Sequence, residues 1–293
     1  MDLIILLVLI ALIWVFFASI FDLKTREVPD WLNYSLIIIG ITFFLINYII
    51  KKDIHFLINP FFGFAIGFLI ANIMYYSKQW GCGDAKLLIA IGLIFYSYPE
   101  SLLKTFNPNI NFLPFILVFL LNLVIIGAIY GILWAINLGI KNNNLLKKEF
   151  KAILRKNIRI RKILVMSVLI LLLLSFLLDE FLRIFIFITV IISLFLLYLS
   201  LFIKSVENSC MFKKITIDKL TEGDWVVDKI IINNNLVYTP RNIGISKEDI
   251  ENLKKYKNKI NYVTIKEGIP FVPSFFISLI ISLVFGNIVL FFI

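Results

Sequence analysis

The chain has 293 residues, of which 60% are hydrophobic and only 16% are charged, and its mean hydropathy is +0.95. These values exclude an ordinary water-soluble domain. The net charge of +10 does not indicate nucleic-acid binding, because the basic residues lie beside apolar segments and not on a basic, aromatic-rich domain.

Apolar segments recur along the chain, and a bilayer crossing takes about 20 such residues. We predict eight spans, near residues 3–21, 34–50, 56–76, 85–97, 112–140, 163–178, 181–203 and 271–293. The first lacks the basic start and small-residue cleavage site of a secretory signal peptide, so we expect it to be retained. The fourth is short, so it either begins within the preceding Gly81-Cys82-Gly83-Asp84 turn or is shielded by its neighbours.

Basic residues in the connections predict the orientation of these spans. The odd-numbered loops hold Lys24, Arg26, Lys78, Lys86 and the densely basic segment 141–162. The even-numbered loops hold only Lys51, Lys52, Lys104 and Arg183. The excess of positive charge favours a cytoplasmic location for the odd loops, with both termini outside. Asp22 and Asp84, which border odd loops, then face the same side.

The loop 141–162 has apolar residues at helical spacing with basic residues between them. It predicts a basic amphipathic helix on the membrane surface, bound to anionic lipid, or else a substrate-docking helix. Glycine and alanine recur every four residues in the third span, at Gly63, Gly67 and Ala71, which predicts close helix packing. The fifth span repeats this spacing at Gly127, Gly131, Ala135 and Gly139.

Residues 204–267 form a polar stretch with strand-like runs at 215–217, 225–232 and 262–265 around the turn Asn233-Asn234-Asn235. Ser246 followed by Asp249 is typical of a helix start. We expect a small cytoplasmic α+β subdomain here. The predicted domains are a membrane core at 1–140, the basic loop at 141–162, a helix pair at 163–203, this subdomain at 204–267 and a last span at 268–293.

Few residues are suited to metal or triad chemistry. Cys82 and Cys210 form no CxxC pair, so neither a disulfide framework nor a zinc cluster is indicated. His55 is the only histidine and lies away from any obvious nucleophile, which argues against a Ser-His-Asp triad. We predict neither a cofactor nor a metal.

Two aspartates stand at span edges in distinctive surroundings. Asp22 precedes Val28-Pro29 at the end of the first span, and Asp84 lies in Gly81-Cys82-Gly83-Asp84, two residues before Lys86. Either aspartate alone fits an interfacial ion pair or a chance motif.

Together, these two motifs resemble those of the archaeal type IV prepilin and preflagellin (prearchaellin) peptidases, membrane aspartyl proteases with a Gly-x-Gly-Asp motif. The segment Lys266 to Pro273 also looks like the entry to the last helix of archaeal members. The resemblance implies an all-α polytopic fold with a six-helix core, to which this chain adds a helix pair near 163–203. It implies Asp22 and Asp84 as the catalytic pair.

The resemblance also implies the reaction and the substrate. Two close carboxylates cannot both ionise easily, so they share a proton while one polarises the scissile carbonyl and the other activates water. From its place at a helix N-terminus we expect Asp84 to be the base, and Asp22, at a helix C-terminus, the acid. The implied partners are membrane lipid and precursor pilins or archaellins with class III signal peptides, whose short basic leader is cut at the cytoplasmic face. No nucleic-acid partner is predicted.

Five further residues are candidates for substrate binding: Gly81, Gly83, Glu27, Asp30 and Lys86. Gly81 and Gly83 allow close approach of the substrate backbone, and Lys86 lies beside Asp84. Glu27 and Asp30 either bind the basic leader or neutralise Lys24 and Arg26 as solvated loop charges. Two other functions stay open for the whole chain: a proton-coupled transporter, which would place acids near mid-bilayer, and a non-catalytic scaffold of a filament or secretion machine.

Overall fold

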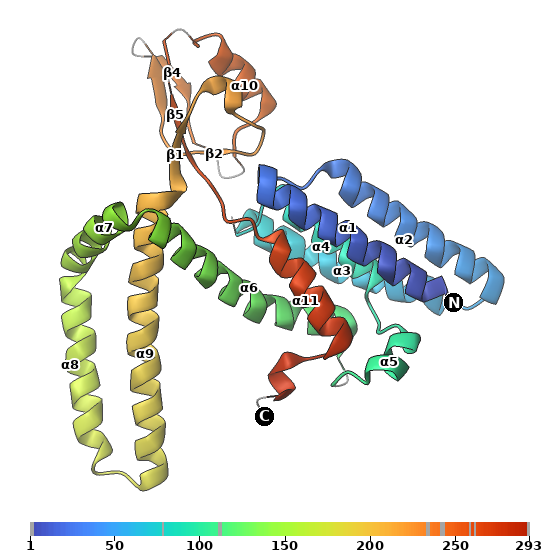
Figure 1. Ribbon diagram of the computed structural model, residues 1–293, viewed down its shortest axis with the longest axis horizontal. Coiled ribbons are helices and arrows are strands. Elements are labelled where there is room, and N and C mark those ends of the chain that lie inside the picture. Colours follow the sequence, from blue (N-terminus) through green and yellow to red (C-terminus); the bar gives the residue numbers. More distant parts are fainter. Residues whose placement is uncertain are drawn as a thin grey trace. The chain divides into compact units, whose positions relative to one another are not determined.

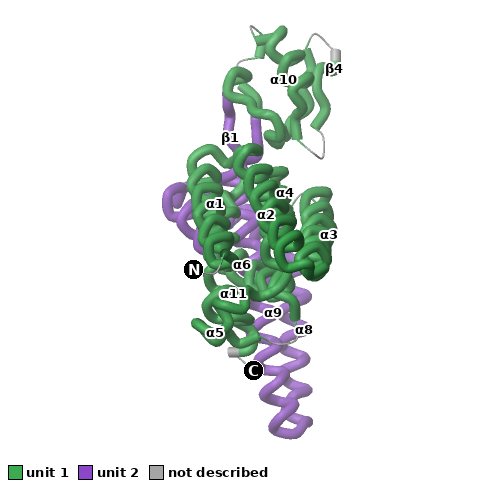
Figure 2. The backbone as a smooth tube through the Cα atoms, turned by 90° about the vertical axis from the view of Figure 1, so that its right-hand side faces the viewer, with its two compact units in different colours: residues 1–131, 216–263, 268–293 green, residues 132–215, 264–267 purple. Residues whose placement is uncertain are grey.

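The structure is a computed structural model that describes residues 3–77, 79–110, 113–232, 235–240, 244–257, 259–260 and 262–291. Some features named above lie outside these ranges: Met1 and Asp2, Lys78, the turn residues Asn233 and Asn234, and the last two residues of the eighth predicted span. Two compact units can be distinguished, residues 1–131, 216–263 and 268–293 in the first and residues 132–215 and 264–267 in the second (Figure 2). The domain boundaries given above stay predictions.

Helices dominate the first unit, as its apolar segments predict. They are α1 (Leu3–Thr25), α2 (Asp30–Lys51), α3 (His55–Tyr76), α4 (Cys82–Ile94), α5 (Glu100–Phe106), the first part of α6 (Phe115–Lys141) and α11 (Val272–Val284), followed by the 3₁₀ turn η3 (Ile288–Phe291). Figure 1 shows α1 to α4 side by side. The helix α3 has 22 residues and is therefore about 33 Å long, which matches a hydrocarbon core of about 30 Å.

The short helix α4 packs against α1, α2 and α3. Its residues Leu87, Leu88 and Ile91 are fully buried. A Cβ atom placed on Gly63 of α3 would overlap the carbonyl oxygen of Gly92 in α4, so the two backbones touch. The predicted packing role of the small residues in α3 is therefore confirmed. The helix α4 begins at Cys82, inside the Gly-rich turn, and it is shielded by other helices. Both explanations offered for the short fourth span are therefore correct.

A buried amide joins α6 to the C-terminal segment. Asn122 is completely buried and donates from Nδ2 to the Ser282 hydroxyl oxygen at 2.8 Å and to the Gly286 carbonyl oxygen at 2.7 Å. Its Oδ1 accepts the backbone N–H of Ile288 at 3.1 Å. Because buried polar groups need partners, these bonds fix how α6 and α11 lie against each other.

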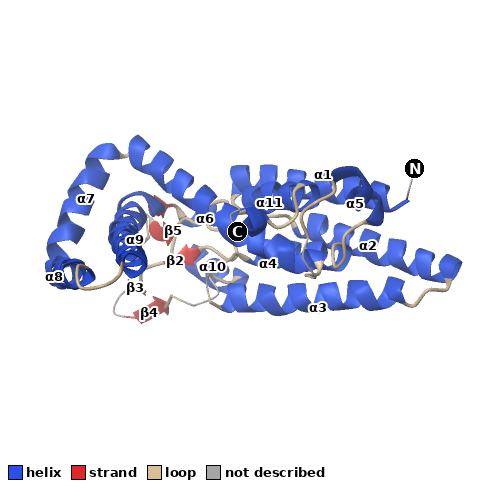
Figure 3. Ribbon diagram, turned by 90° about the horizontal axis from the view of Figure 1, so that it is seen from below, coloured by secondary structure: helices blue, strands red, loops and turns tan. Residues whose placement is uncertain are grey.

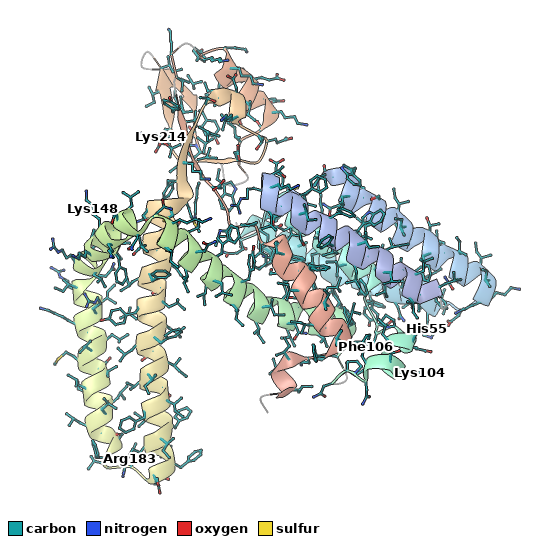
Figure 4. All side chains as sticks on the ribbon, viewed as in Figure 1. His55, Lys104, Phe106, Lys148, Arg183 and Lys214 are labelled. Carbon is teal, nitrogen blue, oxygen red and sulfur yellow. The ribbon has the colours of Figure 1, made fainter. Side chains whose placement is uncertain are left out.

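The second unit contains a long helical hairpin. After the last part of α6 come α7 (Asn143–Lys156), α8 (Ile158–Ser175) and α9 (Glu180–Val206), which continues as the π-helical turn η1 (Glu207–Met211) and the strand β1 (Phe212–Ile215). Both α7 and α8 pack on α9. Figure 4 shows Arg183 at the turn between α8 and α9, and Lys148 at the other end of the hairpin. Arg183 donates to the carbonyl oxygens of Ser175 and Leu178 at 3.4 and 3.1 Å, which closes the turn.

Strands occur in the polar stretch after the hairpin (Figure 3). Its elements are β1, the 3₁₀ turn η2 (Ile217–Lys219), β2 (Trp225–Val226), β3 (Ile230–Ile232), β4 (Asn235–Tyr238), α10 (Lys247–Lys254) and β5 (Val263–Lys266). The strand β1 is hydrogen-bonded to β5, and β3 pairs antiparallel with β4.

The predicted elements of this stretch match with shifts of a few residues. The first predicted strand is placed too late, because β1 ends at Ile215 and η2 follows it. The predicted helix start is confirmed: the Asp249 N–H donates to the Ser246 hydroxyl oxygen at 3.2 Å, and the Ser246 N–H donates to the Asp249 carboxylate at 3.3 Å.

Five described helices are long and apolar enough to cross a bilayer: α1, α2, α3, α6 and the helix from Glu180 to Met211. The predicted count of eight is not confirmed. The helices α4 and α11 have 13 residues each, and α8 begins with Arg159, Arg161 and Lys162 among its 18 residues. The chain therefore has the character of a multi-pass membrane protein, with α4 shielded by other helices.

We expect Gly63→Ala to lower the free energy of unfolding by about 1–3 kcal/mol, because the added methyl group forces α3 and α4 apart. Gly131→Ala in α6 is the matched control, since nothing lies within 4 Å of a Cβ at that position. The thermal unfolding midpoint in detergent measures both. Equal midpoints for the two variants would contradict close α3–α4 contact.

Candidate active site

Asp22 lies in the last turn of α1 and is 5% exposed. Its Oδ2 accepts a hydrogen bond of 2.8 Å from the backbone N–H of Val272, the first residue of α11. The chain leaves the helix just after Asp22, because Arg26 adopts a left-handed conformation with φ of 63°. The carboxylate thus sits where α1 ends and α11 begins.

Asp84 is the third residue of α4 and is half-buried. Its Oδ2 accepts the backbone N–H of Gly81, the residue that caps the helix, at 3.1 Å. The charge of Asp22 acts on Asp84, so the two carboxyl groups lie within electrostatic reach of each other. The helical packing therefore brings together the two aspartates singled out by the sequence.

The connection between α1 and α2 is fastened to the start of α4. The Asp30 carboxylate and the Lys86 ammonium group form an ion pair of 2.6 Å. The Asn33 amide donates to the Gly83 carbonyl oxygen at 3.4 Å, and Val28 is 93% buried against the Gly83 backbone. These three contacts hold the segment after Asp22 beside the segment that carries Asp84.

The start of α11 forms a further wall of the site that the sequence did not predict. Ser19 donates from its hydroxyl to the Val272 carbonyl oxygen at 3.3 Å. The ring of Phe271 lies 5.9 Å from that of Trp80, centroid to centroid, and against Gly127 of α6. Pro273 in the first turn is a sequence signal for a helix start, but no local pattern linked that helix to Asp22.

Tyr130 of α6 also faces this region, since the charges of Asp22 and Arg26 both act on its phenol. Sequence reasoning missed this residue, because one tyrosine in an apolar span has no distinguishing context. Within the described residues, no group of three or more His, Cys, Asp or Glu side chains is placed to hold a metal ion.

The five other candidate residues fall into different positions. Asp30 and Lys86 bind each other, and Gly83 packs on Val28. Gly81 is exposed, and a Cβ there would meet only Asp84, at 3.6 Å. Glu27 is exposed and forms no ion pair within the described part of the chain. Gly81, Glu27 and the Asp30 side chain, which is 60% exposed despite its ion pair, therefore remain accessible to another molecule.

Residues 9–132 match the type IV leader peptidase family. The preflagellin peptidase of Methanococcus maripaludis is 30% identical over 99 residues, which are 33% of this chain and 43% of the relative. That of Methanocaldococcus jannaschii is 29% identical over 96 residues, 33% of this chain and 41% of the relative. The matched segment thus spans less than half the length of these curated relatives. No solved structure matches the chain.

We expect Gly83→Ala to loosen the connection between α1 and α2, because the new methyl group would lie 3.0 Å from the Val28 Cβ. Hydrogen–deuterium exchange of the amides between residues 26 and 33 should become faster than in the wild type. Gly81→Ala is the control, since its methyl group meets nothing but the Asp84 carboxylate. Unchanged exchange in Gly83→Ala would contradict the inference that packing on Gly83 holds the connection between α1 and α2 in place.

Proposed function

Since residues 9–132 match the type IV leader peptidase family, we propose that this membrane protein is an aspartic endopeptidase with Asp22 and Asp84 as its catalytic pair. The observation that carries the proposal is the packing of the connection that follows Asp22 against the start of α4, which carries Asp84. In this arrangement the charge of Asp22 acts on Asp84. Each aspartate has a backbone N–H donor of its own, from Val272 or Gly81, which holds its carboxylate in place.

The reaction follows from this pairing. Two adjacent carboxyl groups share one proton, because both cannot ionise easily at close range. The protonated member donates to the scissile carbonyl oxygen while the ionised member takes a proton from the attacking water. The resulting tetrahedral intermediate then collapses, and the leaving amine receives the proton.

The expected division of roles between the aspartates rested on the helix that carries each of them. Asp22 also receives an N–H from the start of α11, so both carboxylates are acceptors at a helix N-terminus. This contact removes the simple dipole argument for Asp22 as the acid. We therefore assign the proton to the pair and not to one residue.

We propose a precursor pilin or archaellin as the substrate, with a short basic leader before an apolar helix. The relatives are named preflagellin peptidases, which supports this substrate class. Cleavage at the cytoplasmic face is part of this proposal, and the excess of Lys and Arg in the connections near Asp22 and Asp84 supports it. Glu27, exposed and unpaired within the described chain, is the acidic group we assign to the leader, whereas Asp30 is bound to Lys86.

Replacing either catalytic carboxylate should abolish cleavage. We expect Asp22→Asn and Asp84→Asn each to slow processing of a precursor pilin or archaellin by about 100-fold or more, since the proton transfer that each supplies is lost. The assay uses purified protein in liposomes and follows the release of the leader by mass.

Asp228→Asn is the matched control, because Asp228 is exposed and lies in the polar stretch. The Asp228→Asn variant should cleave the precursor at the wild-type rate. Full activity in a well-folded Asp22→Asn or Asp84→Asn variant would refute the aspartic mechanism. Failure of the wild type on all pilin and archaellin leaders would refute the substrate class.

We expect Glu27→Gln to raise KM for a basic leader roughly two- to fivefold with kcat unchanged, because exposed ion pairs contribute up to about 1 kcal/mol. A leader whose basic residues are replaced by glutamine should bind wild type and variant equally. If Glu27→Gln also raises KM for that neutral leader, the residue does not act through charge.

A further inference from the structure

The second unit leaves most of the α8–α9 hairpin uncovered by protein. Large apolar side chains point outward along both helices, among them Leu173, Phe181 and Ile191, which are 70%, 77% and 64% exposed. The helix from Glu180 to Met211, which contains α9, is long and apolar enough to cross a hydrocarbon core. The hairpin thus has the length and surface of a membrane-embedded element.

One end of this hairpin is strongly basic. We define the basic collar as seven exposed residues of α7 and the start of α8: Lys147, Lys148, Lys151, Arg155, Lys156, Arg159 and Lys162. The only acidic residue between positions 143 and 162 is Glu149, and it accepts a hydrogen bond from Asn208 at 2.9 Å. No ion pair or hydrogen bond of a collar side chain is found within the described residues.

Two neighbouring cations of the same unit are already bound within the protein. Arg161 donates to the Tyr198 hydroxyl oxygen at 3.2 Å and to the Leu154 carbonyl oxygen at 3.3 Å. Lys204 pairs with Glu207 at 2.9 Å. The collar therefore differs from these residues in having charge that no described group neutralises.

The apolar face of α7 is also used inside the protein. Ile153 is buried, Phe150 is half-buried, and α7 packs on α9. Leu146 lies against Gly139 of α6, where a Cβ would collide with its side chain. The predicted amphipathic helix therefore turns its apolar face to the protein and leaves its basic face exposed.

We propose that the basic collar binds the headgroups of anionic phospholipids. A surface with seven cations and no described counter-ion is complementary to a negatively charged leaflet. The collar adjoins the end of an apolar hairpin of membrane length, which puts it at headgroup depth. The contact is electrostatic and needs no insertion of α7 among the acyl chains. A basic leader peptide would be repelled by the same charges, which excludes the docking role for this helix.

The test measures the thermal unfolding midpoint of the full-length protein in detergent with added phosphatidylglycerol or phosphatidylcholine. We expect the anionic lipid to raise the midpoint more than the zwitterionic one, since a ligand of the folded state stabilises it. In about 1 M NaCl, where the screening length is about 3 Å, this difference should vanish.

The triple variant Lys147→Gln, Lys148→Gln, Lys151→Gln should lose at least half of the phosphatidylglycerol-specific gain. The matched control is Lys219→Gln, Lys229→Gln, Lys254→Gln, which removes the same charge from exposed positions outside the collar and should keep the gain. An undiminished gain in the collar variant, or equal gains from both lipids, would overturn the proposal. A gain from a double-stranded oligonucleotide but not from phosphatidylglycerol would identify a nucleic-acid surface instead.

Discussion

The burial of the Asp22 carboxylate is the constraint on which the arrangement of the site depends. A carboxylate that is 5% exposed requires a hydrogen-bond donor, because a buried polar group without one is costly. The backbone N–H of Val272 supplies it at 2.8 Å. This bond ties α11 to α1, and the Ser19 hydroxyl strengthens the same contact. Residues near the end of the described chain are therefore part of a site whose recognisable motifs all lie near its beginning.

In the sequence, the second unit lies between the residues of the site near the start of the chain and those of α11. The family match ends at residue 132, where the second unit also begins, and α11 belongs again to the first unit. The segment that matches the family is thus separated in sequence from α11, which packs against it within the first unit. The two units differ in how their helices are packed. Glycines let α3 and α4 touch and so position Asp84, whereas the α8–α9 hairpin carries many large apolar side chains that no described part of the chain covers.

Sequence reasoning predicted the features that depend on local patterns. Apolar length located α1, α2, α3, α6 and α9, and residue spacing identified the α7 helix and the glycine contact of α3. It did not predict the partner of Asp22, because the Val272 N–H is a backbone group that carries no residue signature. It also did not predict that Gly83 packs on Val28 or that Asp30 pairs with Lys86, since it considered Asp30 only as a leader-binding group or a counter-charge to Lys24 and Arg26. These contacts join residues that are far apart in the chain, and no local pattern in a single sequence identifies such partners.

The hydrogen bond between Asp22 and Val272 also has a consequence for biosynthesis. Its two residues are 250 positions apart, and ribosomes add about 5–20 residues per second. Asp22 is therefore synthesised about 12–50 s before Val272, the residue whose N–H completes the surroundings of the Asp22 carboxylate. During that interval the Asp22 carboxylate lacks its backbone donor, and one wall of the candidate site is missing. The surroundings of Asp22 are therefore completed only after a segment 250 positions further along the chain has been synthesised.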